Sequence, residues 1–118
     1  MSMEWQEMIA IGSVSLLLVV LSWYYKTHPP KKINEYYGYR TRRSMSNPEI
    51  WKAANHHSAN RFWEMSWALV VVGVILMVFE PPYPVIIHCG ALLLGILFAF
   101  LATENYLNKH FDKNGNPK

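Results

Sequence analysis

The chain has 118 residues, of which 52% are hydrophobic and only 16% are charged, with a formal net charge of +3. A soluble globular domain carries about 25% charged residues, so this composition argues against a soluble protein. The length fits a single domain that covers residues 1–118.

The first predicted element is a membrane span over about residues 8–25, a run of 18 residues without a charged side chain. A helix needs about 20 residues, with a lower limit of about 17, to cross the apolar core of a bilayer. The residues before this run are acidic (MSMEWQE), whereas a signal peptide begins with basic residues. We therefore expect a retained transmembrane helix here.

The second element is an amphipathic connection over residues 26–61, which is polar, basic and aromatic at once. Its first part contains Pro29 and Pro30, which exclude a continuous helix. Further along, Asn47 is a favourable N-cap residue and Pro48 suits the first helical position. We expect a helix to begin there and either to run straight into the next span or to bend at the membrane interface.

Two further spans are predicted over about residues 62–79 and 85–102, joined by the short link EPPYP. No helix can run through the three prolines of this link, so the two spans should form an antiparallel hairpin. Small residues recur at every fourth position in the last span (Ala91, Gly95 and Ala99), which allows close helix packing. The predicted fold class is therefore an all-α integral membrane protein with three transmembrane helices.

The positive charges predict the orientation of the chain. Eight of the eleven Lys and Arg residues lie in the connection, and the other three lie in the tail of residues 103–118. Because basic segments stay on the cytoplasmic side, the N-terminus is expected outside and the C-terminus inside. The bilayer then accounts for the basic charge, and no nucleic-acid partner is needed.

The connection carries the motifs PPKKIN, YGYRT, SM and NPEIWKAAN in this order. Over about residues 29–60 the pattern resembles the SdpI-type immunity proteins, bacterial membrane proteins that protect a cell against its own secreted toxic peptide. The two following spans and the FDKNGN tail fit as well, although larger family members carry additional spans before this module. The resemblance implies a multi-pass protein of the bacterial cytoplasmic (inner) membrane that gives resistance to a membrane-active peptide toxin, with sensing of the toxin as a further role.

The positions that match the family signature are the candidate site, and Arg40 among them can pair with a carboxylate, a phosphate or helix-end carbonyls. The candidate residues are Asn34, Tyr37, Gly38, Tyr39, Arg40, Thr41, Ser44, Asn47, Trp51 and Asn55. Their predicted cytoplasmic position argues against direct contact with a toxin that arrives from outside. Either these residues only fold the connection under the bundle, or they form an internal clasp or a dock for a cytoplasmic protein partner.

Two alternative functions place a site at the same face, formed by the YGYRT segment: a membrane enzyme, and a protein that binds anionic lipids. No nucleophile–base pair at a recognisable spacing supports an enzyme, so no catalytic residue and no cofactor are expected. A proton-coupled transporter is disfavoured because Glu64 and Glu104 lie at the ends of their spans. The basic residues fit lipid binding, although the positive-inside rule explains the same charges.

Histidines could point to a metal site or to a polar contact inside the membrane. His56 and His57 are adjacent, so on a helix they point about 100° apart and are poorly placed to share a metal, and no metal is expected. His88 lies within the last span, where a hydrogen bond to a neighbouring helix is one expectation and a functional role is the other. Because three spans bury little area against one another, a homodimer is a further expectation.

Overall fold

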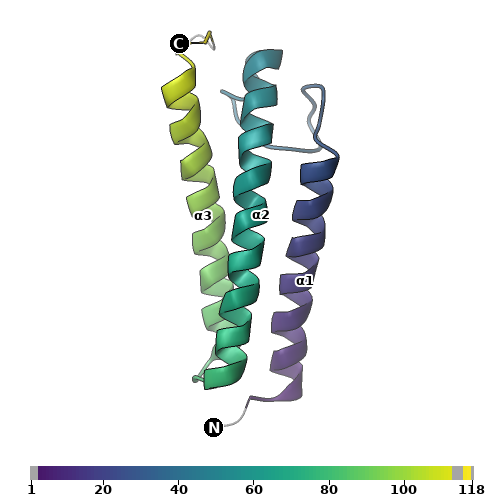
Figure 1. Cartoon of the computed structure of the whole chain (residues 1–118), viewed down its shortest axis with the longest axis vertical. Helices are drawn as coiled ribbons and strands as arrows, with labels where there is room; N and C mark the ends of the chain where they lie inside the picture. Colours follow the sequence, from purple (N-terminus) through teal and green to yellow (C-terminus); the bar gives the residue numbers. More distant parts are fainter. Residues whose placement is uncertain (1–2, 113–115, 118) are drawn as a thin grey trace.

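A computed structural model describes residues 3–112 and 116–117 of the chain. It contains three long helices, α1 (Trp5–Thr27), α2 (Pro48–Phe79) and α3 (Pro84–His110). Figure 1 shows them side by side as a bundle, with α2 in the middle. The helix α2 packs against both of the others, whereas α1 and α3 contact each other little. Part of the FDKNGN segment lies outside the described residues.

Each helix is long and apolar enough to cross a membrane, judged by length and composition. The outer surface of the bundle is apolar as well: Leu16, Val78 and Leu94 each expose about two thirds of their surface. A soluble monomer rarely exposes a large contiguous apolar patch. The structure therefore confirms the prediction of an all-α protein with three apolar helices and indicates a multi-pass membrane protein.

The helices extend beyond the apolar segments that define the predicted spans. The clearest case is α2, which begins at Pro48 and continues without interruption to Phe79. The side chain of Asn47 caps it by accepting a hydrogen bond from the backbone N–H of Ile50 at 2.9 Å. The helix expected to begin at this N-cap thus runs straight into the second span, and the basic half of α2 extends the bundle beyond its apolar part.

The link between α2 and α3 is a tight turn, which confirms the predicted antiparallel hairpin. The helix α2 ends at Phe79 and α3 begins with Pro84. Glu80 and Tyr83 adopt left-handed backbone conformations, with φ of 47° and 56°. The Glu80 carboxylate accepts a hydrogen bond from the backbone N–H of Met3 at 3.0 Å, so the same turn also holds the start of the chain.

Two buried polar pairs join the helices inside the apolar part of the bundle. Ser15 on α1 and His88 on α3 lie 3.0 Å apart at Oγ and Nε2, which confirms the expected hydrogen bond between His88 and a neighbouring helix. Ser22 on α1 and Ser66 on α2 lie 2.9 Å apart at their hydroxyl oxygens. Such contacts keep polar groups satisfied where no water can reach them.

Gly95, in the middle of the small-residue pattern of α3, faces α2. A Cβ atom on Gly95 would lie 2.5 Å from the Cγ atom of Met65, so only a glycine allows this approach without movement of Met65. Ala99, one turn later, is also buried. The two antiparallel helices therefore pack closely at Gly95.

Candidate functional site

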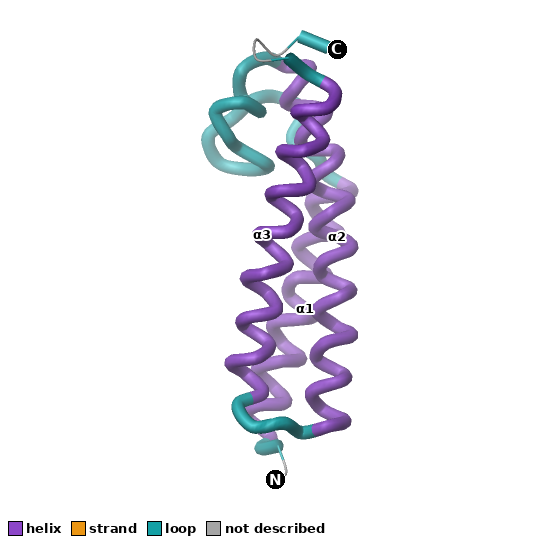
Figure 2. The backbone as a smooth tube through the Cα atoms, turned by 90° about the vertical axis from the view of Figure 1, so that its left-hand side faces the viewer, coloured by secondary structure: helices purple, strands orange, loops and turns teal. Residues whose placement is uncertain are grey.

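The connection between α1 and α2, residues 28–47, folds back over one end of the bundle. Figure 2 shows it as a loop beside the ends of α2 and α3, at the same end as the C-terminal residues. The candidate residues of the motif lie in this loop and on the first turns of α2. Their contacts decide whether the motif faces inward or outward.

Asn55 of α2 is the centre of the arrangement, and its side chain is 1% exposed. Its Oδ1 atom accepts two hydrogen bonds, from the backbone N–H of Tyr39 at 2.6 Å and from the hydroxyl of Tyr25 at 2.7 Å. Its Nδ2 atom donates to the carbonyl of Trp51 at 2.9 Å. A single amide therefore links the end of α1, the YGYRT segment and α2.

Gly38 makes this contact possible because a larger residue would not fit. Its φ is +107°, a conformation that residues with a side chain rarely adopt. A Cβ atom on Gly38 would lie 2.6 Å from Oδ1 of Asn55 and 2.7 Å from Cγ of Pro30. Pro30 is itself fixed, because its carbonyl accepts a hydrogen bond from the indole N–H of the fully buried Trp51 at 2.8 Å.

Thr41 and Ser44 close the next turn of the loop by bonding each other in both directions. The backbone N–H of Thr41 donates to Oγ of Ser44 at 2.8 Å, and the backbone N–H of Ser44 donates to Oγ1 of Thr41 at 3.0 Å. The Ser44 hydroxyl in turn donates to the carbonyl of Tyr39 at 2.8 Å. Ser44 is fully buried, so its side chain replaces the water that the loop backbone would otherwise need.

Asn34 and Tyr37 organise the first half of the loop. The Asn34 side chain accepts hydrogen bonds from the backbone N–H groups of Tyr36 and Tyr37, at 2.9 Å and 2.7 Å, which forms a local Asx turn. The Tyr37 hydroxyl donates to the carbonyl of His28 at 2.8 Å. The Tyr37 ring also meets the Tyr25 ring edge-on at 5.7 Å, so the loop rests against the end of α1.

Tyr39 extends the network to α3. Its hydroxyl donates to the carboxylate of Glu104, while its backbone N–H bonds to Asn55. Burial and the Glu104 carboxylate together raise the pKa of Tyr39 above its ordinary value. The phenol therefore keeps its proton and remains a hydrogen-bond donor at neutral pH. We call the group Tyr25, Gly38, Tyr39, Ser44, Trp51 and Asn55 the clasp.

Arg43 joins the loop to the end of α3, a contact that the sequence motif does not indicate. Its guanidinium donates to the side chain of Asn108 and to the carbonyls of Leu107 and Phe111, the last two at 3.2 Å and 2.9 Å. The last carbonyls of a helix lack partners inside the helix and carry partial negative charge. Arg43 therefore caps α3 and fixes its end relative to the loop.

Arg40 behaves differently from its neighbours in the YGYRT motif. It is exposed and makes no hydrogen bond or ion pair with any residue that the structure describes. The sequence offered helix-end carbonyls as one partner for Arg40, but Arg43, three positions later, takes that place. The clasp thus presents Arg40 outward from a loop whose backbone is held on both sides.

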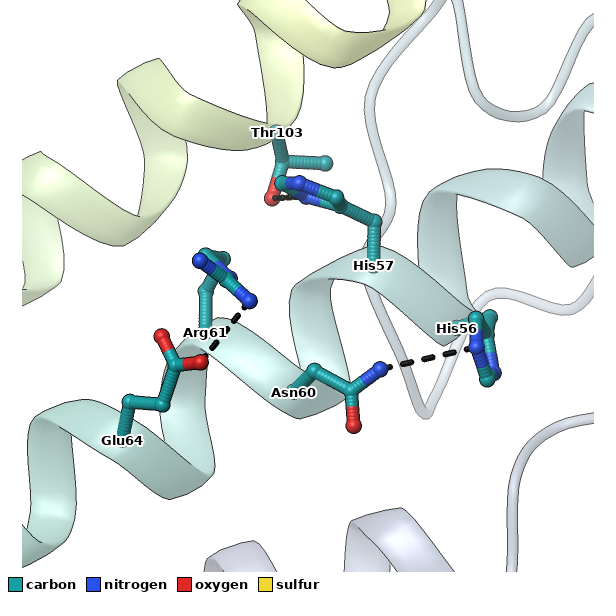
Figure 3. Close-up of polar contacts among 6 residues, drawn as sticks. All are labelled: His56, His57, Asn60, Arg61, Glu64 and Thr103. Atoms are coloured by element: carbon teal, nitrogen blue, oxygen red, sulfur yellow. Dashed lines mark hydrogen bonds and ion pairs between the residues drawn. The ribbon is translucent and has the colours of Figure 1, made fainter.

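Adjacent histidines on α2 face different neighbours, as their spacing predicts. Figure 3 shows His57 directed toward Thr103 of α3, whereas His56 lies near Asn60 on another side of α2. The corresponding distances are 3.2 Å from Nδ1 of His57 to Oγ1 of Thr103 and 3.5 Å between His56 and Asn60. Across residues 3–112 and 116–117, no three His, Cys, Asp or Glu side chains are grouped as metal ligands would be.

The geometry brings together every candidate residue except Arg40 in one hydrogen-bonded unit or in its adjoining turns. Sequence reasoning missed Tyr25, Arg43 and Glu104, which are the partners of the motif on α1, in the loop and on α3. An aromatic residue at the end of a span and a basic residue in a loop have common explanations. The positions of these three residues in the sequence therefore did not indicate that they contact the motif.

Comparison with known proteins identifies the family of this chain. The model of the SdpI/YfhL protein family matches residues 31–104, which include most of the connection, all of α2 and most of α3. The uncharacterized protein YfhL of Bacillus subtilis (strain 168) is 35% identical over 91 residues, 77% of this chain and 79% of that protein. No solved structure matches the chain. On the extent of these matches, the chain belongs to the SdpI/YfhL protein family.

Proposed function

We propose that this protein is a membrane immunity protein, which gives a bacterium resistance to a secreted, membrane-active peptide toxin. The observation that carries the proposal is the family match over residues 31–104. The match includes the motif-bearing connection and the two helices that the motif holds together. Resistance is the role that the resemblance to SdpI-type immunity proteins implies for such a module.

The geometry of the clasp supports a binding role more than a catalytic one. The polar groups of Tyr39, Ser44 and Asn55 are occupied by one another and by the backbone. An enzyme needs a nucleophile or base that is free to meet a substrate. We therefore propose a non-enzymatic function, in which the clasp holds the connection and Arg40 is the group available for contact.

The predicted orientation of the chain decides which kind of partner Arg40 can meet. The connection, residues 28–47, and the last turn of α3 both carry basic residues, and they lie at the same end of the bundle. The positive-inside rule predicts that this end lies on the cytoplasmic side of the bacterial inner membrane, with the N-terminus outside. A toxin would then meet the opposite end or the lipid-facing helices. We propose that Arg40 contacts an acidic group on a cytoplasmic protein, which would report the presence of the toxin.

The test is the survival of a sensitive bacterium that expresses this chain and is challenged with a membrane-depolarising peptide toxin. Three strains are compared at equal membrane level: the parent chain, Arg40→Ala, and Arg42→Ala as the matched control. Arg42 is also an exposed arginine of the same loop without an ion pair to a described residue. The two substitutions therefore remove the same charge.

We expect protection by the parent chain and by Arg42→Ala, and a loss of at least about tenfold in survival for Arg40→Ala, since removal of a charged contact weakens binding by about tenfold or more. Failure of the parent chain to protect would refute the immunity function. Full protection by Arg40→Ala would instead show that the motif only folds the connection.

A further inference from the structure

A cavity of about 510 Å³ opens beside the clasp, between the end of α1, the start of the connection and the basic half of α2. Three lysines line it, and each comes from a different segment: Lys26 from α1, Lys31 from the connection and Lys52 from α2. No Asp or Glu side chain is among its lining residues. The fold thus gathers positive charge from three places around one space.

These lysines are not neutralised within the described part of the chain. None of them forms an ion pair with a described residue. The ion pair found among the described residues joins Arg61 to Glu64, as Figure 3 shows. Like charges that share a cavity repel one another, and an anion in the cavity would remove this repulsion. The positive-inside rule explains why lysines gather at this end of the bundle, but it does not explain why three of them line one cavity.

The remaining lining groups fit an anion that is attached to an apolar body. His56 and Asn60, one turn apart on α2, add polar groups that can donate hydrogen bonds. Pro30 and Ala59 contribute apolar wall. A phosphate group accepts several hydrogen bonds from lysine ammonium groups and side-chain amides. An inorganic phosphate would use the polar groups and leave the apolar walls without a partner.

The depth of the cavity points to a lipid as the source of the phosphate. The ammonium group of Lys26 lies 5.4 Å from the centre of the Trp63 ring. Tryptophan rings concentrate at the level of the lipid headgroups. The Lys26 ammonium group, which belongs to a lining residue of the cavity, is therefore expected at the level of the lipid phosphates, and basic pockets at this level bind anionic headgroups.

We propose that this cavity binds the phosphate group of an anionic membrane lipid through Lys26, Lys31 and Lys52. The site differs from the YGYRT segment, where the sequence placed an alternative lipid-binding site, although Asn55 borders both the cavity and the clasp. The inference does not depend on the immunity function, since the cavity and its charges are present whether or not the protein protects a cell.

The experiment measures lipid binding to the purified full-length chain by native mass spectrometry, with phosphatidylglycerol, phosphatidylcholine and inorganic phosphate as separate probes. The cavity variant combines Lys26→Gln, Lys31→Gln and Lys52→Gln. The control variant combines Lys32→Gln, Arg42→Gln and Lys109→Gln, which removes the same charge at residues that do not line the cavity. Thermal unfolding of both variants checks that they are folded.

We expect the parent chain and the control variant to prefer phosphatidylglycerol, and the cavity variant to bind it at least about tenfold more weakly, since each lysine near the surface contributes about fivefold. Equal loss in both variants would overturn the proposal, because only net charge would then matter. Inorganic phosphate that binds as tightly as the lipid would overturn the lipid as the source. If the cavity variant does not fold, the single variants Lys31→Gln and Lys32→Gln are compared instead. We then expect Lys31→Gln to bind phosphatidylglycerol about fivefold more weakly than Lys32→Gln does.

Discussion

At the scale of single residues, the clasp depends on one backbone conformation and one amide. Gly38 turns the loop so closely over Asn55 that the backbone N–H of Tyr39 reaches the Asn55 side chain. The same amide also accepts a hydrogen bond from the Tyr25 hydroxyl. Because each group is buried or half-buried, an unmade hydrogen bond here would cost about 1–3 kcal/mol. The motif residues are therefore explained first by their structural role, which is to fold the connection around the side chain of Asn55.

Gly38→Ala is expected to open the clasp. An alanine at φ of +107° is strained by more than about 1 kcal/mol, and its Cβ would lie 2.6 Å from Oδ1 of Asn55. The control is Gly90→Ala on α3, where a Cβ atom would meet nothing within 4 Å. Thermal unfolding and trypsin cleavage after Lys31 measure the effect. Equal behaviour of the two variants would show that the close approach at Gly38 is not required.

At the scale of elements, the helices were predictable and the contacts of the loop were not. Apolar segments long enough for a bilayer locate the helices, and Asn47 with Pro48 locates the start of α2, because these signals are local in sequence. Whether Arg40 or Arg43 reaches the end of α3 depends on how the loop crosses the bundle. That path is decided by Asn55, Glu104 and other residues far away in the chain, and local patterns do not contain it.

The contact between Arg43 and the end of α3 can be tested separately. Arg43→Ala should release the carbonyls of Leu107 and Phe111 and loosen the last turn of α3 by about 0.5–1.5 kcal/mol. Hydrogen exchange of the amides near that end should become faster, while exchange in the middle of α2 should not change. Arg42→Ala removes the same charge without touching α3 and should leave both regions as they are. Unchanged exchange in Arg43→Ala would contradict the capping role.

At the scale of the whole molecule, both the buried polar pairs and the clasp hold the three helices together. Ser15 with His88 and Ser22 with Ser66 join the helices inside the apolar part, and the clasp joins them outside it. Since lipid is as apolar as the helix surfaces, such polar contacts and close packing replace the hydrophobic effect as the forces between helices. The orientation of this bundle in the membrane then depends on where the basic end lies.

Labelling of single cysteines tests that orientation. Cys89 is first replaced with serine, and either Lys32→Cys in the connection or Tyr83→Cys in the α2–α3 turn is then introduced. Both residues are exposed, and the connection and the α2–α3 turn lie at opposite ends of the bundle. Because basic segments stay in the cytoplasm, a membrane-impermeant thiol reagent should label Tyr83→Cys in intact spheroplasts and Lys32→Cys only after permeabilisation. The reverse pattern would place the clasp and Arg40 outside, within reach of a secreted toxin. A cytoplasmic partner would then be excluded, and direct contact between Arg40 and the toxin would become the mechanism to test.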